Sequence, residues 1–130
     1  MPPKSVAPDV FPRLREVLRA ISRDYTVQLN TDEVYSLAMK GLVYKKKPIF
    51  FAAVTGKENY IGFNLLPLAI CPALAKHVTP QLKKLRHGYN CFHFTEVNET
   101  LLGQLKTLVA ASAAAYPAGL KTAGFEISRD

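Results

Sequence analysis

Apolar residues recur at helical spacing near the start of the chain. Across residues 10–21 they fall three or four positions apart, and arginines occupy many of the positions between them. This periodicity predicts an amphipathic helix that begins at Asp9, whose carboxylate can cap it, and that tolerates Pro12 in its first turn. Before it, residues 1–8 contain three prolines and little that can pack, so we expect a disordered N-terminal arm.

The pattern then changes to one that favours strands. Residues 33–44 have moderate β content and residues 48–54 form a continuous apolar run, with a break of three lysines between them. We therefore predict a β-hairpin, reached through a link at Asn30, with its turn at residues 45–47. Residues 60–65 alternate between apolar and other side chains, which predicts a third strand.

The second half of the chain predicts a broken helix followed by a short strand. Residues 72–86 have helical character with an interruption at Pro80. Gly88 would end this helix in the left-handed conformation that glycine tolerates. Residues 90–96 then alternate as a strand.

The last predicted element is a helix that begins at Asn98, which can cap it, and ends at Pro117 and Gly119. Residues 120–130 would form a C-terminal tail that could add an edge strand. The order of elements predicts one α+β domain at residues 9–119, in which helices cover one face of an antiparallel sheet of four to five strands. The other face of the sheet would be open to water or a ligand.

Four motifs, in this order, resemble the YdhG-like domains of unknown function that are found in bacteria. They are Phe50-Phe51-Ala52, Tyr60-Ile61-Gly62-Phe63, Gly88 and Cys91-Phe92-His93-Phe94. The similarity covers residues 35–119, and Tyr89 and Asn90 stand where the family commonly has a lysine and a serine. The resemblance implies a YdhG-like α+β fold, no established reaction and no catalytic residue. Some members of that superfamily are likened to frataxin, an iron-delivery protein, which implies a metal (iron) chaperone as one alternative.

The charge of the chain bears on that alternative. Seventeen lysines and arginines against ten acidic residues give a net charge of +7 and a sequence pI near 9.5. Frataxin-type iron binding relies on an acidic surface, because hard iron prefers carboxylates, so the basic excess argues against it. The same excess makes anionic partners worth testing, although a basic surface in contact with water explains it as well.

The length and the hydrophobic fraction of the chain indicate a globular protein. The 130 residues, 48% of them hydrophobic, suit one globular domain. No apolar stretch approaches the about 20 residues of a membrane span, and the N-terminus does not resemble a secretory signal. We therefore expect a cytoplasmic protein with no membrane partner, in which Cys71 and Cys91 are reduced.

Cys91 and His93 carry the most obvious chemistry. Two positions apart on a strand, they share a face, and the phenylalanines beside them point to the other. In the expected register Tyr60 and Asn64 lie on the same open face, where Gly62 leaves room. Tyr60, Asn64, Cys91 and His93 are therefore our candidate ligand-binding residues. The alternative is structural, since a strand cysteine commonly behaves as a small hydrophobe beside a surface histidine.

Neither catalysis nor metal binding is expected at this pair. Residues two apart on a strand lie nearly 7 Å from each other, at about 3.3 Å per residue, which is too far for a direct hydrogen bond without side-chain reach. A structural zinc site needs about four ligands, and nothing in the sequence brings His77 and His87 to Cys91 and His93. We assign no catalytic residue, no metal ligand and no cofactor, and lean towards a protein that is not an enzyme.

Basic residues near two predicted turns suggest a different function. The polyanion-binding candidates are Lys45, Lys46, Lys47, Lys83, Lys84 and Arg86. They could contact phosphates, and Tyr44 and Tyr89 beside them could stack on bases. No recognition helix or RNA-binding motif accompanies them, and lysines at a turn also protect a hairpin from pairing with other chains.

The leading interpretation is noncatalytic binding of a small ligand or a protein partner on the open sheet face. Nucleic-acid or other polyanion binding through the basic turns is the first alternative, and a metal chaperone is the second. A homodimer formed through an exposed sheet edge also remains open.

Overall fold

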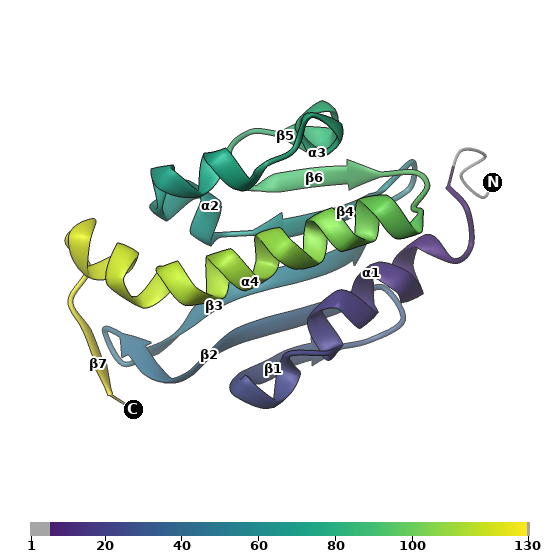
Figure 1. Cartoon of the computed structure of the whole chain (residues 1–130). Helices are drawn as coiled ribbons and strands as arrows, with labels where there is room; N and C mark the ends of the chain where they lie inside the picture. Colours follow the sequence, from purple (N-terminus) through teal and green to yellow (C-terminus); the bar gives the residue numbers. More distant parts are fainter. Residues whose placement is uncertain (1–5, 130) are drawn as a thin grey trace.

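The chain folds as an antiparallel sheet with helices on one face. The structure is a computed structural model that describes residues 6–129 (Figure 1). Its two longest helices are α1 (Val10–Arg19) and α4 (Glu99–Thr122), and both lie across the same face of the sheet (Figure 1). The strands of the described residues are β1 (Tyr25–Asn30), β2 (Val34–Tyr44), β3 (Lys47–Gly56), β4 (Ile61–Leu65), β5 (Arg86–His87), β6 (Cys91–Phe94) and β7 (Ile127–Arg129).

This architecture confirms the predicted α+β class, with a larger sheet than expected. Residues 6–129 contribute seven strands rather than four to five, in the order β1-β2-β3-β4-β6-β5. The seventh strand, β7, pairs with the end of β2, where Tyr44 lies opposite Ile127. All neighbouring strands are antiparallel.

One of the additional strands is β1, in the segment that was interpreted as a link. Tyr25 stacks on Phe51 with ring centroids 4.4 Å apart. Val27 and Leu29 remain 43% and 50% exposed, because β1 is an edge strand and a bulge interrupts its register with β2 between these two residues. Tyr25, Val27 and Leu29 alternate with polar residues, a pattern typical of a strand that the sequence analysis did not use.

The predicted hairpin is present, with a tighter turn than expected. Its turn is formed by Lys45 and Lys46, whereas Lys47 begins β3 opposite Tyr44. Lys45 and Lys46 have φ angles of 50° and 65°. A two-residue turn of this kind needs positive φ at both central positions, where a side chain other than that of glycine or asparagine is strained.

Three short helical pieces connect β4 to β5 and confirm the predicted break in this segment. They are α2 (Pro67–Ile70), the 3-10 helix η2 (Pro72–His77) and α3 (Pro80–Leu85). Thr79 caps α3, since its hydroxyl accepts a hydrogen bond from the N–H of Leu82 at 3.2 Å. A further 3-10 turn, η1 (Ser22–Asp24), joins α1 to β1.

The core lies between the sheet and the two long helices. Phe51, Phe63 and Phe92, from three neighbouring strands, have no exposed surface, and Tyr116 of α4 is 1% exposed. Tyr116 packs against Phe51 with ring centroids 5.9 Å apart, and its hydroxyl donates a hydrogen bond to the carbonyl of Phe50 at 2.7 Å. Each such side chain contributes about 1.5–3 kcal/mol through burial, so these residues determine which face of each strand is inward.

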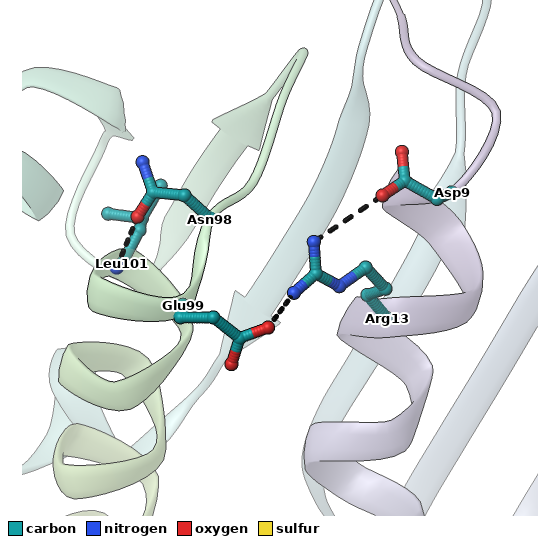
Figure 2. Close-up of polar contacts among 5 residues, drawn as sticks. All are labelled: Asp9, Arg13, Asn98, Glu99 and Leu101. Carbon is teal, nitrogen blue, oxygen red and sulfur yellow. Dashed lines mark hydrogen bonds and ion pairs between the residues drawn. The ribbon is translucent and has the colours of Figure 1, made fainter.

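The starts of the two long helices are joined by polar contacts (Figure 2). The Oδ1 of Asn98 accepts a hydrogen bond from the N–H of Leu101 at 2.8 Å, which confirms the predicted cap of α4. Asp9 occupies the capping position of α1, but its side chain makes no capping bond there and pairs with Arg13 at 3.4 Å instead. Arg13 also pairs with Glu99, the first residue of α4, and so connects the two helix starts.

The prediction that the last helix ends at Pro117 and Gly119 was wrong, because α4 continues to Thr122. A proline inside a helix costs about 3 kcal/mol, since it removes a hydrogen bond and crowds the preceding turn. Tyr116 and Leu120, only 1% and 4% exposed, lie on either side of it. Their burial, at about 1.5–3 kcal/mol each, offsets that cost.

Part of the expected N-terminal arm is attached to the domain. Residues 1–5 lie outside the described residues. Val6 and Ala7 pack against the core, and the N–H of Ala7 donates to the carbonyl of Thr95 at 3.1 Å. Among residues 6–129, no helix combines the length and apolar character that crossing a membrane requires.

Two glycines of α4 provide a matched test of this packing. At Gly103 an added Cβ meets open space, so Gly103→Ala should raise the free energy of unfolding by about 0.5–1 kcal/mol. At Gly119 an added Cβ would overlap the Sγ of Cys71, which donates to the carbonyl of Ala115 at 3.7 Å. Gly119→Ala should therefore lower the free energy of unfolding by about 1–3 kcal/mol in chemical denaturation. In a Cys71→Ala background most of this loss should disappear, and a loss that persists there would contradict the packing argument.

Candidate functional site

The strand register brings the four candidate ligand-binding residues to one face of the sheet. Where β4 pairs with β6, Gly62 lies opposite His93 and Asn64 lies opposite Cys91. The phenylalanines between them are buried under the helices, so these side chains point away from α1 and α4. Tyr60, directly before β4, reaches the same face and stacks on His93.

Three aromatic rings lie parallel on this face, and we call them the ring row: Tyr60, His93 and His87. The ring centroids of Tyr60 and His93 are 3.8 Å apart with an interplanar angle of 15°. Those of His87 and His93 are 3.7 Å apart at 12°. His93 is therefore the middle ring. A Cβ added at Gly62 would lie 3.6 Å from the Cε2 of Tyr60, an ordinary van der Waals contact, so the row does not depend on glycine at this position.

His87 is the member of the ring row that the sequence analysis missed. We expected it at the end of a helix and away from His93, but α3 ends at Leu85 and His87 lies in β5, opposite Cys91. Gly88 is left-handed as predicted, with φ 71°, yet it forms the turn from β5 to β6 rather than the helix end. The signal was present in the sequence, because a glycine shortly before a strand can also close a hairpin.

Two asparagine amides border the ring row. The Nδ2 of Asn90 donates to the Oδ1 of Asn64 at 2.6 Å, and the backbone carbonyl of Asn90 accepts from the N–H of Leu65 at 2.7 Å. Asn90 had been noted only as a departure from the family pattern. Within residues 6–129 the Nδ2 of Asn64 and the Oδ1 of Asn90 have no hydrogen-bond partner, so one donor and one acceptor are left for a ligand.

The groups on this face are able to stack and to form hydrogen bonds. Both faces of the His93 ring are covered by rings, and no hydrogen bond between His93 and Cys91 is present in the described part of the chain. Nor does any group of three His, Cys, Asp or Glu side chains gather within residues 6–129 as ligands for a metal ion. The arrangement offers flat rings and polar amides, which suits a planar ligand.

The ring row also influences the protonation of His93. Partial burial between the two neighbouring rings lowers the pKa of His93, and a positive charge on His87 lowers it further. The neutral form of His93 is thereby favoured. A neutral middle ring stacks on His87 without repulsion between like charges.

The two basic clusters do not form one continuous surface. Lys83 and Lys84 lie in the last turn of α3, and Arg86 lies in β5, the strand that carries the last ring of the row. The lysines of residues 45–47 lie at the far end of the β2–β3 hairpin, well separated from α3 and β5 (Figure 1). The guanidinium of Arg86 already has a local role, since its Nε and Nη2 donate to the carbonyl of Tyr89 at 2.9 and 2.6 Å.

Comparison with known proteins does not identify a relative. No family model, no curated protein and no solved structure matches this chain. The resemblance to the YdhG-like domains therefore stays a prediction from the sequence motifs, and the function has to be inferred from the site itself.

We predict that part of the pH dependence of stability comes from His93. The unfolded chain takes up a proton at His93 near its ordinary pKa of 6.5, whereas the folded ring resists protonation because its pKa is lowered. This contribution to stability is complete above about pH 6.5 and is lost as the pH falls towards the lowered pKa. His93→Phe keeps a stacked ring and should flatten the fall in Tm between pH 7.5 and pH 5. An NMR titration in which folded His93 shows a pKa of 6.5 or higher would contradict this.

Proposed function

We propose that the domain binds a small planar ligand on its open sheet face and catalyses no reaction there. The observation that carries the proposal is the ring row, in which Tyr60, His93 and His87 stack with centroid separations of 3.8 and 3.7 Å. A planar ligand can extend such a row at either end. Stacking of a base on an aromatic side chain contributes about 1–3 kcal/mol, which is enough to give measurable affinity when hydrogen bonds are added.

The polar groups beside the row favour a heteroaromatic ligand over a hydrocarbon ring. Asn64 and Asn90 offer one amide donor and one amide acceptor, and side-chain amides pair well with the edges of nucleobases. Lys83 and Lys84, in the helix that leads into β5, favour a ligand that also carries a negative charge. A nucleoside or nucleotide has all of these features, and we propose this class.

The other two candidate functions have less support. Polyanion binding through both basic clusters would require one ligand to reach from α3 and β5 to the β2–β3 turn, and the clusters lie at separate places on the fold (Figure 1). A metal chaperone would need carboxylate ligands near one another. No arrangement of side chains described for residues 6–129 favours it over the nucleoside proposal.

An NMR titration with adenosine and AMP tests the proposal. The backbone amides of Gly62, Asn64, Cys91 and His93 should shift on addition of either compound. Tyr60→Ala should weaken binding of adenosine about tenfold or more, since it removes an end ring of the row. Leu29→Ala is the control, because Leu29 is 50% exposed in β1, at the opposite edge of the sheet from β5, and it should leave the affinity unchanged.

The salt dependence separates this proposal from polyanion binding. Binding of neutral adenosine should change little between 50 and 300 mM salt, whereas binding of an oligonucleotide through lysines would weaken steeply. The proposal fails if neither nucleoside shifts the amides of the open face. It also fails if Tyr60→Ala and Leu29→Ala bind adenosine equally well.

A further inference from the structure

A hollow lies on the helix-covered face of the sheet, at the end of α4. It has a volume of about 430 Å³, within the range of ligand-binding cavities. Its wall is mainly apolar and comes from β3, α2, the last turns of α4 and the segment before β7. The apolar side chains are Pro48, Ile49, Phe50, Leu66, Ile70, Leu120 and Phe125. The predominance of apolar side chains in its wall distinguishes this hollow from the more polar depressions elsewhere on the surface.

The mouth of this hollow is cationic. Lys45 and Lys47 lie on its rim, and the Nζ of Lys45 lies 5.3 Å from the centre of the Tyr44 ring. Tyr44 in turn meets Phe125 edge to face, with ring centroids 5.3 Å apart. In the described part of the chain the ion pairs involve only Arg13 and Arg19 as cations, so no described carboxylate within 4.0 Å neutralises the two lysines.

Of the two lysines at the hollow, Lys45 lies in the hairpin turn and Lys47 begins β3 directly after it. Lys45 and Lys46 have left-handed backbone angles, with φ 50° and 65°, where asparagine and glycine are favoured. The two-residue turn itself requires these angles, and it places Lys45 beside the hollow.

We propose that this lysine-rimmed pocket binds a straight-chain fatty carboxylate, with its chain in the cavity and its carboxylate between Lys45 and Lys47. The apolar wall excludes a ligand that is polar throughout, and the unpaired lysines favour an anionic head over a cationic or neutral one. At about 30 Å³ for each methylene-sized group, the cavity holds a chain on the order of ten carbons. This site is separate from the ring row, which lies on the opposite face of the sheet.

Isothermal titration calorimetry with decanoate below its micellar concentration tests the proposal. One equivalent of decanoate should bind, and decyltrimethylammonium, which has the same chain and a cationic head, should bind at least about tenfold more weakly. Octanoate should bind about fifteenfold more weakly than decanoate, because each buried methylene contributes about 0.8 kcal/mol, or nearly fourfold in affinity. The proposal would be overturned if the affinity depended on neither the charge of the head group nor the length of the chain.

Variants locate the binding within the fold. Ile70→Trp fills the cavity and should reduce decanoate affinity at least tenfold, and Leu66→Phe provides a second filled variant if Ile70→Trp does not fold. Replacing Lys45 and Lys47 together by glutamine should weaken decanoate about threefold to tenfold, within the usual range for exposed ion pairs. Lys57→Gln is the matched control, since Lys57 is an exposed lysine in the β3–β4 connection and should not affect binding.

Three outcomes would contradict the proposal. The first is a folded Ile70→Trp or Leu66→Phe protein that binds decanoate as tightly as the parent. The second is an equal effect of Lys57→Gln and the double lysine variant. The third is a loss of decanoate binding in Tyr60→Ala, which would place the fatty acid at the ring row instead.

Discussion

The burial of phenylalanines along neighbouring strands is the constraint on which the rest of the structure depends. Phe51, Phe63 and Phe92 have no exposed surface, and the register between β4 and β6 places Phe63 opposite Phe92. A shift of β6 by one residue would exchange Phe92 for His93 in the core, at about 1.5–3 kcal/mol for each phenylalanine exposed. The open face therefore carries Asn64, Cys91 and His93 because the phenylalanines occupy the other one.

The same buried layer determines how far α4 extends, and hence whether the lysine-rimmed pocket exists. Tyr116 packs on Phe51 and hydrogen-bonds to the carbonyl of Phe50, which holds the helix against β3 beyond the point where Pro117 would be expected to end it. Leu120 then reaches the pocket wall. If the helix stopped at Pro117, Leu120 and Phe125 would not be placed in the pocket wall.

The sequence predicted those features that repeat over several residues. The inward faces of β4 and β6 follow from apolar residues at every second position, and the apolar stripes of α1 and α4 follow from helical spacing. His87 was missed because a strand of two residues, Arg86–His87, has no periodicity to detect. The end of α4 was misplaced because tertiary burial outweighed the local effect of Pro117.

The lysine-rimmed pocket could not have been found from any single motif. Its wall combines side chains from β3, α2, α4 and the segment that contains Phe125, and only the folded chain brings these together. The three lysines before Pro48 were visible in the sequence, but not the cavity beside them. The composition gives the number of charged residues but does not show which side chains surround them in the fold.

The basic residues behind the net charge of +7 therefore form separate local clusters and not one continuous basic surface. Charges on the surface of a protein are screened over about 8 Å at physiological ionic strength, so clusters at separate ends of the fold act independently. Lys83 and Lys84 precede the strand that carries His87, whereas Lys45 and Lys47 border an apolar cavity. Under the two proposals the surface beside each group determines the preferred anion: the ring row favours a flat ring near Lys83 and Lys84, and the apolar cavity favours an alkyl chain near Lys45 and Lys47.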